Sequence, residues 1–437
     1  MRALIYPAAL VVLGLSGRSP AQDDFDFGEE EMPAATDAQE ASSGLPFRGK
    51  LGLNFARQTG QPERWIKQSP YLNGVLDYSS DWGSLYGEGT LSYNAAFEQE
   101  GDLEETIDHY EQERILRELY YKKSFGDFTL SLGKMTVVWG KGDLLSVLDV
   151  VSPKDQTELF YARPEDTRLG QNLLKLDLWL GAQQLTVLYA PQPVMNRLPL
   201  HGHPYARYPD FHEERSDDAE AGLRWNGEFS GTSVALIGGR FHYRDPVLGM
   251  AGLQVEGSWP LMDVAGITLA QTMGDVLVKV EAARYHDYPY QYFAIMQIPP
   301  NFIVVPAVEM ADTSAWMLGL DYNHDDWGSF ILEVNGYMPD TEDEDKEVTS
   351  TLLAAASWTK NLLRDDLTLS LAHLAFETGG NQLQRLGVDF KITSAFILNT
   401  QYTRISIASD DEQYRAIEDF DRFDMGISWN FDLKGEP

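Results

Sequence analysis

Charged side chains alternate with apolar ones in many segments of this chain, and these residues are the best placed for chemistry. Leu174, Leu176 and Leu178, for example, alternate with Lys175 and Asp177. Side chains two residues apart share one face of a strand, so the charges would gather on a face opposite the apolar one. A face with both signs of charge is typical of a wide water-filled passage rather than a single-ion filter. The alternative is that the charges pair with one another and only keep that face hydrated. The candidates on such faces are Lys175, Asp177, Arg224, Lys279, Glu281, Glu333, Arg385, Asp389 and Lys391.

The segment 140–170 carries a second group of candidates. It is too apolar for a loop in water, with Leu144, Leu145 and Val147 among its residues. A connection of this length is usually functional or disordered, and this composition argues against disorder. We therefore expect the segment to fold inward and to narrow a passage, although it could instead pack over a rim for stability alone. The charged residues expected to line the narrowing are Lys154, Asp155, Arg163, Asp166 and Arg168.

Catalytic and metal chemistry have little support in the sequence. The chain has no cysteine, which excludes disulfides, thiolate metal sites and covalently attached c-type haem. Serine, histidine and aspartate are present, but no pattern brings them together as a catalytic triad requires. His201, His203 and His212 share one connection without the fixed spacing of a metal site. We predict no enzyme activity, no cofactor and no bound metal.

Composition narrows the possible partners. The 437 residues include 34 Lys and Arg against 67 Asp and Glu, a net charge of −33, which argues against nucleic acid because phosphates require clustered cations. A mean hydropathy of −0.31 and 12% aromatic residues favour a β-rich protein over a helical membrane protein. The acidic connections 98–113, 340–347 and 410–421 could bind lipopolysaccharide through divalent cations or simply stay hydrated.

Two N-terminal segments differ from the rest of the chain. Residues 1–21 contain Arg2, an apolar stretch and Ser19-Pro20-Ala21, the pattern of a cleaved secretory signal peptide. Residues 22–46 contain eight acidic and no basic residues, so they cannot bury enough apolar surface to offset the entropy of ordering. We predict a disordered acidic periplasmic segment there.

Residues 47–437 are predicted to form one all-β domain, a transmembrane antiparallel up-and-down β-barrel of about 18 strands (16–18). Short and long connections alternate along the chain, which is the mark of an outer-membrane barrel and not of a sandwich. An even number of strands returns both termini to the periplasm. Tyrosine and tryptophan near strand ends would form interfacial girdles. The expected strands are 47–58, 70–81, 84–97, 114–125, 127–139, 171–180, 182–191, 217–229, 231–244, 262–273, 275–287, 313–323, 327–338, 347–360, 366–377, 382–393, 395–408 and 422–432.

The last strand has a role of its own. From Phe423 to Phe431, apolar side chains alternate with Asp424, Gly426, Ser428 and Asn430. This pattern resembles the C-terminal signal that outer-membrane barrels present to their assembly machinery, although six residues follow Phe431. We expect that machinery, together with outer-membrane lipid and lipopolysaccharide, to be partners of the chain.

Four short motifs carry a resemblance to a known family. They resemble the pattern of a Gram-negative outer-membrane protein family of unknown function, which is Gly-Arg-Gln, Trp-Gly, Asp and Asn-Pro-x-Asp. The corresponding residues here are Leu132-Gly133-Lys134, Val138-Trp139-Gly140, Asp149 and Ser152-Pro153-Lys154-Asp155. Lys134 and Ser152 replace the Arg and Asn of that pattern. The resemblance implies an outer-membrane barrel with no settled substrate, with hydrophobic compounds as one suggestion, and it supplies no catalytic residues.

These features favour an outer-membrane channel that passes small or hydrophobic solutes. One alternative is a barrel that sheathes a partner redox protein, such as a multihaem cytochrome, because this chain has no haem motif of its own. Another is an outer-membrane component that exports or takes up hydrophobic compounds, which the aromatic segment 285–306 would favour. Oligomeric state and selectivity are not predicted.

Overall fold

The computed structural model describes residues 6–7, 46–60, 63–96, 112–158, 167–199, 211–214, 218–252, 254–298, 301–340, 351–376, 380–408 and 420–433. Within these ranges, eighteen long strands form one antiparallel sheet, and no helix is long and apolar enough to cross a membrane. The strands are β2 (Phe47–Gln58), β3 (Arg64–Ser80), β4 (Gly83–Tyr93), β5 (Gln112–Phe125), β6 (Phe128–Met135), β7 (Gln171–Leu180), β8 (Gln183–Ala190), β10 (Glu220–Phe229), β11 (Thr232–His242), β14 (Leu261–Met273), β15 (Val276–Ile298), β16 (Asn301–His324), β17 (Gly328–Pro339), β18 (Thr351–Leu362), β19 (Leu367–Phe376), β20 (Asn381–Lys391), β21 (Phe396–Ser406) and β22 (Arg422–Asp432).

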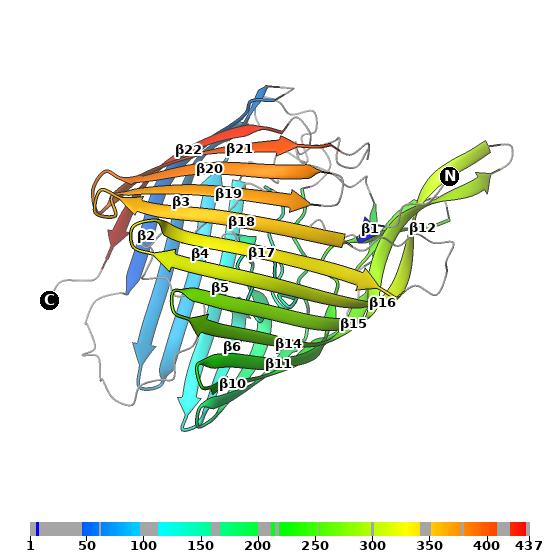
Figure 1. Cartoon of the computed structure of the whole chain (residues 1–437), viewed down its shortest axis with the longest axis horizontal. Coiled ribbons are helices and arrows are strands. Elements are labelled where there is room, and N and C mark those ends of the chain that lie inside the picture. The colour runs from blue at the N-terminus through cyan, green and yellow to red at the C-terminus, as the bar shows by residue number, and fades with distance from the viewer. Residues whose placement is uncertain are drawn as a thin grey trace.

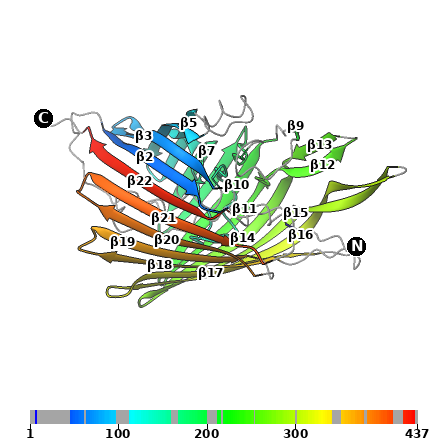
Figure 2. The same ribbon diagram turned by 90° about the horizontal axis from the view of Figure 1, so that it is seen from above.

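The sheet closes on itself between its first and last long strands. β2 pairs with β3 on one side and with β22 on the other, in a register that runs from Arg48↔Asp432 to Gln58↔Arg422. Closure leaves no free sheet edge around the cylinder. A β-protein in hydrocarbon requires such closure, because lipid offers no partner to backbone N–H and C=O groups. Figures 1 and 2 show the inclined strands around a common axis. The predicted 18-strand barrel is confirmed.

Alternation along each strand separates an outer face from a lumen face. On β7, Leu174 and Leu176 are exposed on the outside, whereas Asp177 is completely buried on the inside. On β20, Leu386 and Phe390 are exposed outward and Arg385 is buried. The period of two in the sequence therefore separates lipid-facing from lumen-facing residues.

The two ends of the barrel differ. At one, the turn end, connections of two to four residues join the strands, and Phe47 and Asp432 lie at this end. At the other, the loop end, most connections are longer, and a small sheet of β9 (His212–Glu214), β12 (Val247–Ala251) and β13 (Gln254–Ser258) lies there. The turns are 81–82, 126–127, 181–182, 230–231, 274–275, 325–327, 363–366 and 392–395.

Some predicted boundaries were wrong. The expected loop 288–312 is instead the outer part of β15 and β16, which form a hairpin that projects beyond the loop end (Figure 1). Pro289 and Pro306 are compatible with these strands because they lie where the strands have left the barrel wall, and an edge strand tolerates a missing N–H donor. β3 also begins at Arg64, inside the expected loop 59–69.

Aromatic side chains form a girdle at the turn end. Trp82 stacks on Tyr121 with ring centroids 5.9 Å apart, and Trp358 Nε1 donates a hydrogen bond of 2.8 Å to the carbonyl oxygen of Trp327. The girdle prediction was wrong for four residues near the loop end, which are buried inside the barrel because the chain itself packs against them there. These are Trp139, Tyr243, Tyr285 and Tyr337.

Most of the N-terminal predictions concern residues outside the described ranges. In the first 46 residues, the described residues are Pro46 and the two residues of β1 (Tyr6–Pro7). β1 pairs antiparallel with Tyr290 and Gln291 of β15. The signal peptide and the acidic segment stay predictions. The acidic stretches 98–111, 341–350 and 409–419 and the residues His201 and His203 also lie outside the described ranges.

Candidate functional site

The connection between β6 and β7 enters the barrel and packs against its inner wall. We call its described residues, 136–158 and 167–170, the lumen segment. It leaves the wall after Met135, where the side chain of Glu118 on β5 accepts the Thr136 N–H. Ser152 then holds the start of the segment, because its hydroxyl accepts the N–H of Val137 at 2.8 Å and donates to the carbonyl of the same residue at 3.0 Å.

The first wall anchor is Glu281 on β15, a fully buried carboxylate. It accepts the backbone N–H groups of Gly142 (2.9 Å), Val147 (2.8 Å) and Leu148 (3.1 Å). It also accepts the N–H of Lys141 and the hydroxyl of Ser146. Successive N–H groups that converge on one anion form a concave anion-binding turn. The segment therefore wraps its backbone around a wall carboxylate.

Glycine is required for this wrapping. A Cβ at Gly140 would lie 1.7 Å from Ser146 Oγ and 3.0 Å from Glu281 Oε1. The Gly-Lys-Gly sequence after Trp139 thus allows the chain to close tightly on Glu281.

The second wall anchor is Glu333 on β17. Its two oxygens accept the N–H groups of Asp143 (2.8 Å), Leu144 (2.8 Å) and Leu145 (2.7 Å). Asn335, two residues along the same strand, donates to the carbonyl oxygen of Leu145 at 3.2 Å. One wall strand, β17, therefore holds both the donors and an acceptor of this stretch of the segment.

Lys279 on β15 occupies the centre of three carboxylates. Its ammonium group contacts Asp143 and lies 2.8 Å from Asp321 and 3.3 Å from Glu333. Asp143, Asp321 and Glu333 are close enough to share a metal ion, but the lysine ammonium already provides the cation there. The group acts as a charged link between segment and wall.

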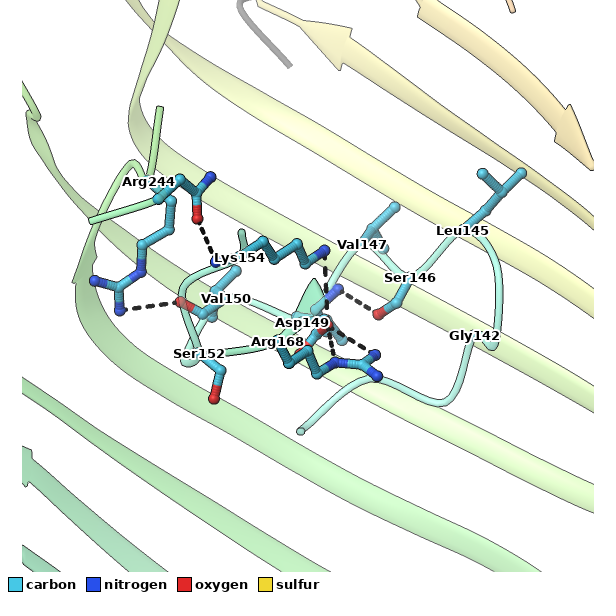
Figure 3. Close-up of polar contacts among 12 residues, drawn as sticks. Gly142, Leu145, Ser146, Val147, Asp149, Val150, Ser152, Lys154, Arg168 and Arg244 are labelled. Carbon is cyan, nitrogen blue, oxygen red and sulfur yellow. Dashed lines mark hydrogen bonds and ion pairs between the residues drawn. The ribbon is translucent and has the colours of Figure 1, made fainter. Parts of the chain in front are cut away.

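Asp149 is the charge centre of the middle of the segment. Arg168 donates to it from Nε and from a terminal nitrogen at 3.1 and 3.0 Å, and Lys154 Nζ lies 3.8 Å away (Figure 3). Burial acts to raise the pKa of the Asp149 carboxyl, but the charges of Arg168 and Lys154 outweigh it and lower that pKa. Burial also lowers the pKa of Lys154. The pair of Asp149 and Arg168 thus joins the two described parts of the segment, 136–158 and 167–170.

A third contact joins the segment to the wall near β10 and β11. Arg244 donates to the carbonyl oxygens of Val151 (2.7 Å) and Val194 (3.0 Å) and to Glu220 (2.7 Å). Asp155 pairs with Arg197 at 2.9 Å. The segment is therefore also fixed at its Ser-Pro-Lys-Asp stretch.

The fourth contact lies across the lumen, next to the strands that close the barrel. Glu158 contacts Lys67 on β3 and lies 3.0 Å from Arg422 on β22. Burial acts to raise the pKa of Glu158, but the charges of Lys67 and Arg422 lower it well below its ordinary value. Arg422, almost fully buried, also lies 2.6 Å from Asp424. The lumen segment thus reaches from β15 and β17 to β3 and β22.

Apolar side chains fill the space between the segment and the wall in two clusters. In the first, Trp139 meets Phe241 edge-to-face at 5.6 Å, and Val147, Leu148 and Val151 pack against β7, β8, β11 and β14–β17. In the second, Leu144 and Leu145 pack against inward-facing residues of β2, β3 and β18–β21. Inward packing of the described residues 140–158 and 167–170 is therefore a feature of the structure, while a role in narrowing a pore stays a prediction.

The predicted lumen residues occupy two places. Lys279, Glu281 and Glu333 meet the segment directly, whereas Lys175 and Asp177 on β7 pair with each other at 3.1 Å. Within the segment, Lys154, Asp155 and Arg168 form ion pairs. Arg163 and Asp166 lie outside the described residues. The remaining predicted wall residues face the lumen by their alternation with outward-facing neighbours, and they are Arg224, Arg385, Asp389 and Lys391.

Several contact residues were missed in the sequence. Glu220, Arg244 and Arg422 lie close to strand ends, where a period of two does not distinguish a wall anchor from a solvated charge. Lys67 fell in an expected loop. The Gly-Lys-Gly stretch at 140–142 was the available signal for a tight backbone turn around an anion, but nothing local identified Glu281 as its partner.

The closed barrel and its inward-folded segment define the class of this protein, which has the fold of Gram-negative outer-membrane porins. The chain belongs to the family described as "Protein of unknown function (DUF1302)", whose model matches residues 77–436. No curated protein matches the sequence.

Solved outer-membrane proteins share the fold at low identity. Acinetobacter baumannii OccAB2 is 10% identical, with 90% of this chain and 100% of that chain covered and a TM-score of 0.51. Acinetobacter baumannii OccAB1 is 10% identical, with coverages of 90% and 99% and a TM-score of 0.49. Salmonella typhi OmpF, solved in complex with daunomycin, is 11% identical, with coverages of 89% and 97% and a TM-score of 0.42. The likeness to OccAB2 supports the barrel fold and says nothing of a solute.

Proposed function

We propose that this protein is a gated outer-membrane channel for small or hydrophobic solutes, in which the lumen segment forms the gate. The observation that carries the proposal is a segment that crosses an 18-strand barrel and is held by reversible polar contacts to Glu281 and Glu333. A barrel of this strand number has a lumen wide enough for water unless something fills it. A segment held by hydrogen bonds and ion pairs can be released without unfolding the wall.

The sheath alternative fits the lumen less well. A barrel that surrounds a partner protein needs its interior free for that partner. Here the interior holds the chain's own residues from Glu281 on β15 across to Glu158 beside Arg422 on β22. We also propose that the protein is not an enzyme, because the polar groups around the segment hold it in place and a channel requires no reacting group.

We propose that the turn end faces the periplasm with both termini and that the loop end faces outward. Short periplasmic turns and long external loops are the rule for such barrels, and the girdle of Trp82, Tyr121 and Trp327 marks the turn-end interface. On this orientation, lipopolysaccharide surrounds the loop end. The outward side chains from Phe423 to Phe431 on β22 present the assembly signal.

Conductance in planar bilayers tests the proposal. The wild-type protein is expected to show discrete steps, and deletion of residues 144–166, from Leu144 to Asp166, is expected to enlarge them severalfold. Heat-modifiable migration on unboiled gels verifies that each variant has closed into a barrel. Equal conductance of the two folded proteins would exclude the segment as a gate, and silent bilayers for both would exclude a channel.

A further inference from the structure

The inner wall has a patch of residues that does not follow the rule for a water-filled barrel. Lumen-facing positions in such barrels are polar, because they meet water. At the loop end of β2, β3 and β18–β21, however, nine buried inward-facing residues are apolar, next to buried polar residues that include Gln58, Asn381 and Thr403. We call this set the apolar wall patch, and it consists of Ala56, Ile66, Leu353, Ala355, Ala372, Leu374, Phe376, Leu383 and Ile405.

The strands that carry the patch are apolar on both faces. On β18, Leu352 faces outward and Leu353 inward, and on β19, Leu371 faces outward and Leu374 inward. The outward residues are explained by lipid. The inward ones require a second apolar surface inside the barrel, because exposed leucine in a wet lumen loses about 1.5–3 kcal/mol relative to a buried one.

Within the described residues, the lumen segment supplies Leu144 and Leu145 to this surface. Their backbone N–H groups both bind Glu333 Oε2, at 2.8 and 2.7 Å, and Asn335 holds the carbonyl of Leu145. The leucine pair is thus held against the patch by polar contacts to β17. Those contacts can break and re-form while the strands that carry the patch stay in the sheet.

We propose that the apolar wall patch is a binding site for an uncharged, apolar solute and that Leu144 and Leu145 occupy it in the closed channel. This inference rests on the proposed channel function and names its substrate class. The patch residues themselves are hydrocarbon, and they extend across neighbouring strands, so the surface fits a hydrocarbon chain or ring better than a sugar or an ion. A solute that replaces the leucine pair recovers the burial that the pair provides and leaves the segment free to move.

Uptake by cells that lack their own general porins tests this assignment. The apolar fluorophore 1-N-phenylnaphthylamine and the hydrophilic, anionic substrate nitrocefin serve as the two probes. In the Leu374→Asn and Leu383→Asn double variant, uptake of the fluorophore is expected to fall roughly tenfold, which corresponds to about 1.4 kcal/mol of lost binding, while nitrocefin uptake changes little. Val75→Asn, on an inward position of β3 nearer the turn end, is the matched control and should leave both rates unchanged.

The segment offers a second variant that does not alter the wall. Leu144→Ala with Leu145→Ala weakens the internal occupant, so uptake of the fluorophore is expected to rise several-fold. The amount and heat-modifiable migration of each variant in the outer membrane verify folding. If neither the Leu374 and Leu383 pair nor the Leu144 and Leu145 pair of substitutions changes fluorophore uptake, and the protein still conducts ions, the apolar site alone is overturned. Absence of conductance and of nitrocefin uptake, even after deletion of residues 144–166, would instead overturn the channel.

Discussion

The two halves of the barrel share their strands and their lipid-facing surface, but their interiors differ. In the turn half, inward side chains are mostly polar and bind one another: Asp177 accepts the Thr186 hydroxyl at 2.6 Å and the Gln184 side-chain amide at 3.2 Å. In the loop half, two apolar clusters surround the lumen segment, and Glu281 and Glu333 bind its backbone near the middle of the wall. The difference shows that an inward residue is apolar where the chain itself covers it and polar where water does.

The largest effect expected from this comparison follows from Glu281→Ala. The change removes the acceptor of three backbone N–H groups and of the Ser146 hydroxyl, at about 1–3 kcal/mol each, so the segment should detach and single-channel conductance should rise several-fold. Asp177→Ala removes a carboxylate that is equally buried in the turn half, and it should change conductance far less. Similar changes in both variants would contradict the distinction between the halves.

A smaller but still large effect is expected for Trp139→Ala. Trp139 is 1% exposed and packs on Phe241, whereas Trp327 in the turn-end girdle is 68% exposed. Truncation of the buried ring should lower the free energy of unfolding by about 3–5 kcal/mol, against about 1 kcal/mol or less for Trp327→Ala. Denaturant unfolding in lipid vesicles measures both, and equal losses would show that the buried cluster contributes no more than the interface does.

Gly140→Ala should have an intermediate effect confined to the loop half. The new methyl group collides with Ser146 Oγ and must push the turn away from Glu281, at about 1–3 kcal/mol. Gly249 on β12 has open space around its Cβ position and is the matched control. Limited proteolysis of the folded protein should cut the lumen segment faster in Gly140→Ala than in Gly249→Ala, and equal rates would argue against a tight turn.

The smallest effect is a pH dependence at Glu158. Its folded pKa is depressed by Lys67 and Arg422, so its stabilising contribution is fully present above about pH 4.5, the ordinary range of a glutamate, and is lost as pH falls below it. Between pH 7 and pH 3, the wild-type channel should therefore open more often as the solution is acidified. Glu158→Gln should open more often already at pH 7 and should respond less to acid. Parallel pH profiles for the two proteins would remove Glu158 from the set of anchors.

Much of the fold could be predicted because its signal is local. The alternation around Lys175 and Asp177 fixes which face of β7 meets lipid, and short turns such as 126–127 fix where strands reverse. The hairpin of β15 and β16 was not predicted. Its prolines are typical of loops in a sequence, and only the structure shows that they lie in parts of the strands outside the barrel wall. The lumen segment was expected to fold inward from its apolar residues alone, but its anchors were not identified.

The sequence by itself determined the barrel. Apolar and polar residues alternate along each strand, and this alternation shows which side chains face hydrocarbon and which face the lumen. Only the tertiary structure decided which lumen residues act together. Glu281 lies about 140 positions from the turn at Gly142, and Glu158 is far in sequence from Arg422. Such pairs meet because the strands close into a cylinder, and closure brings together residues whose local sequences contain no information about each other.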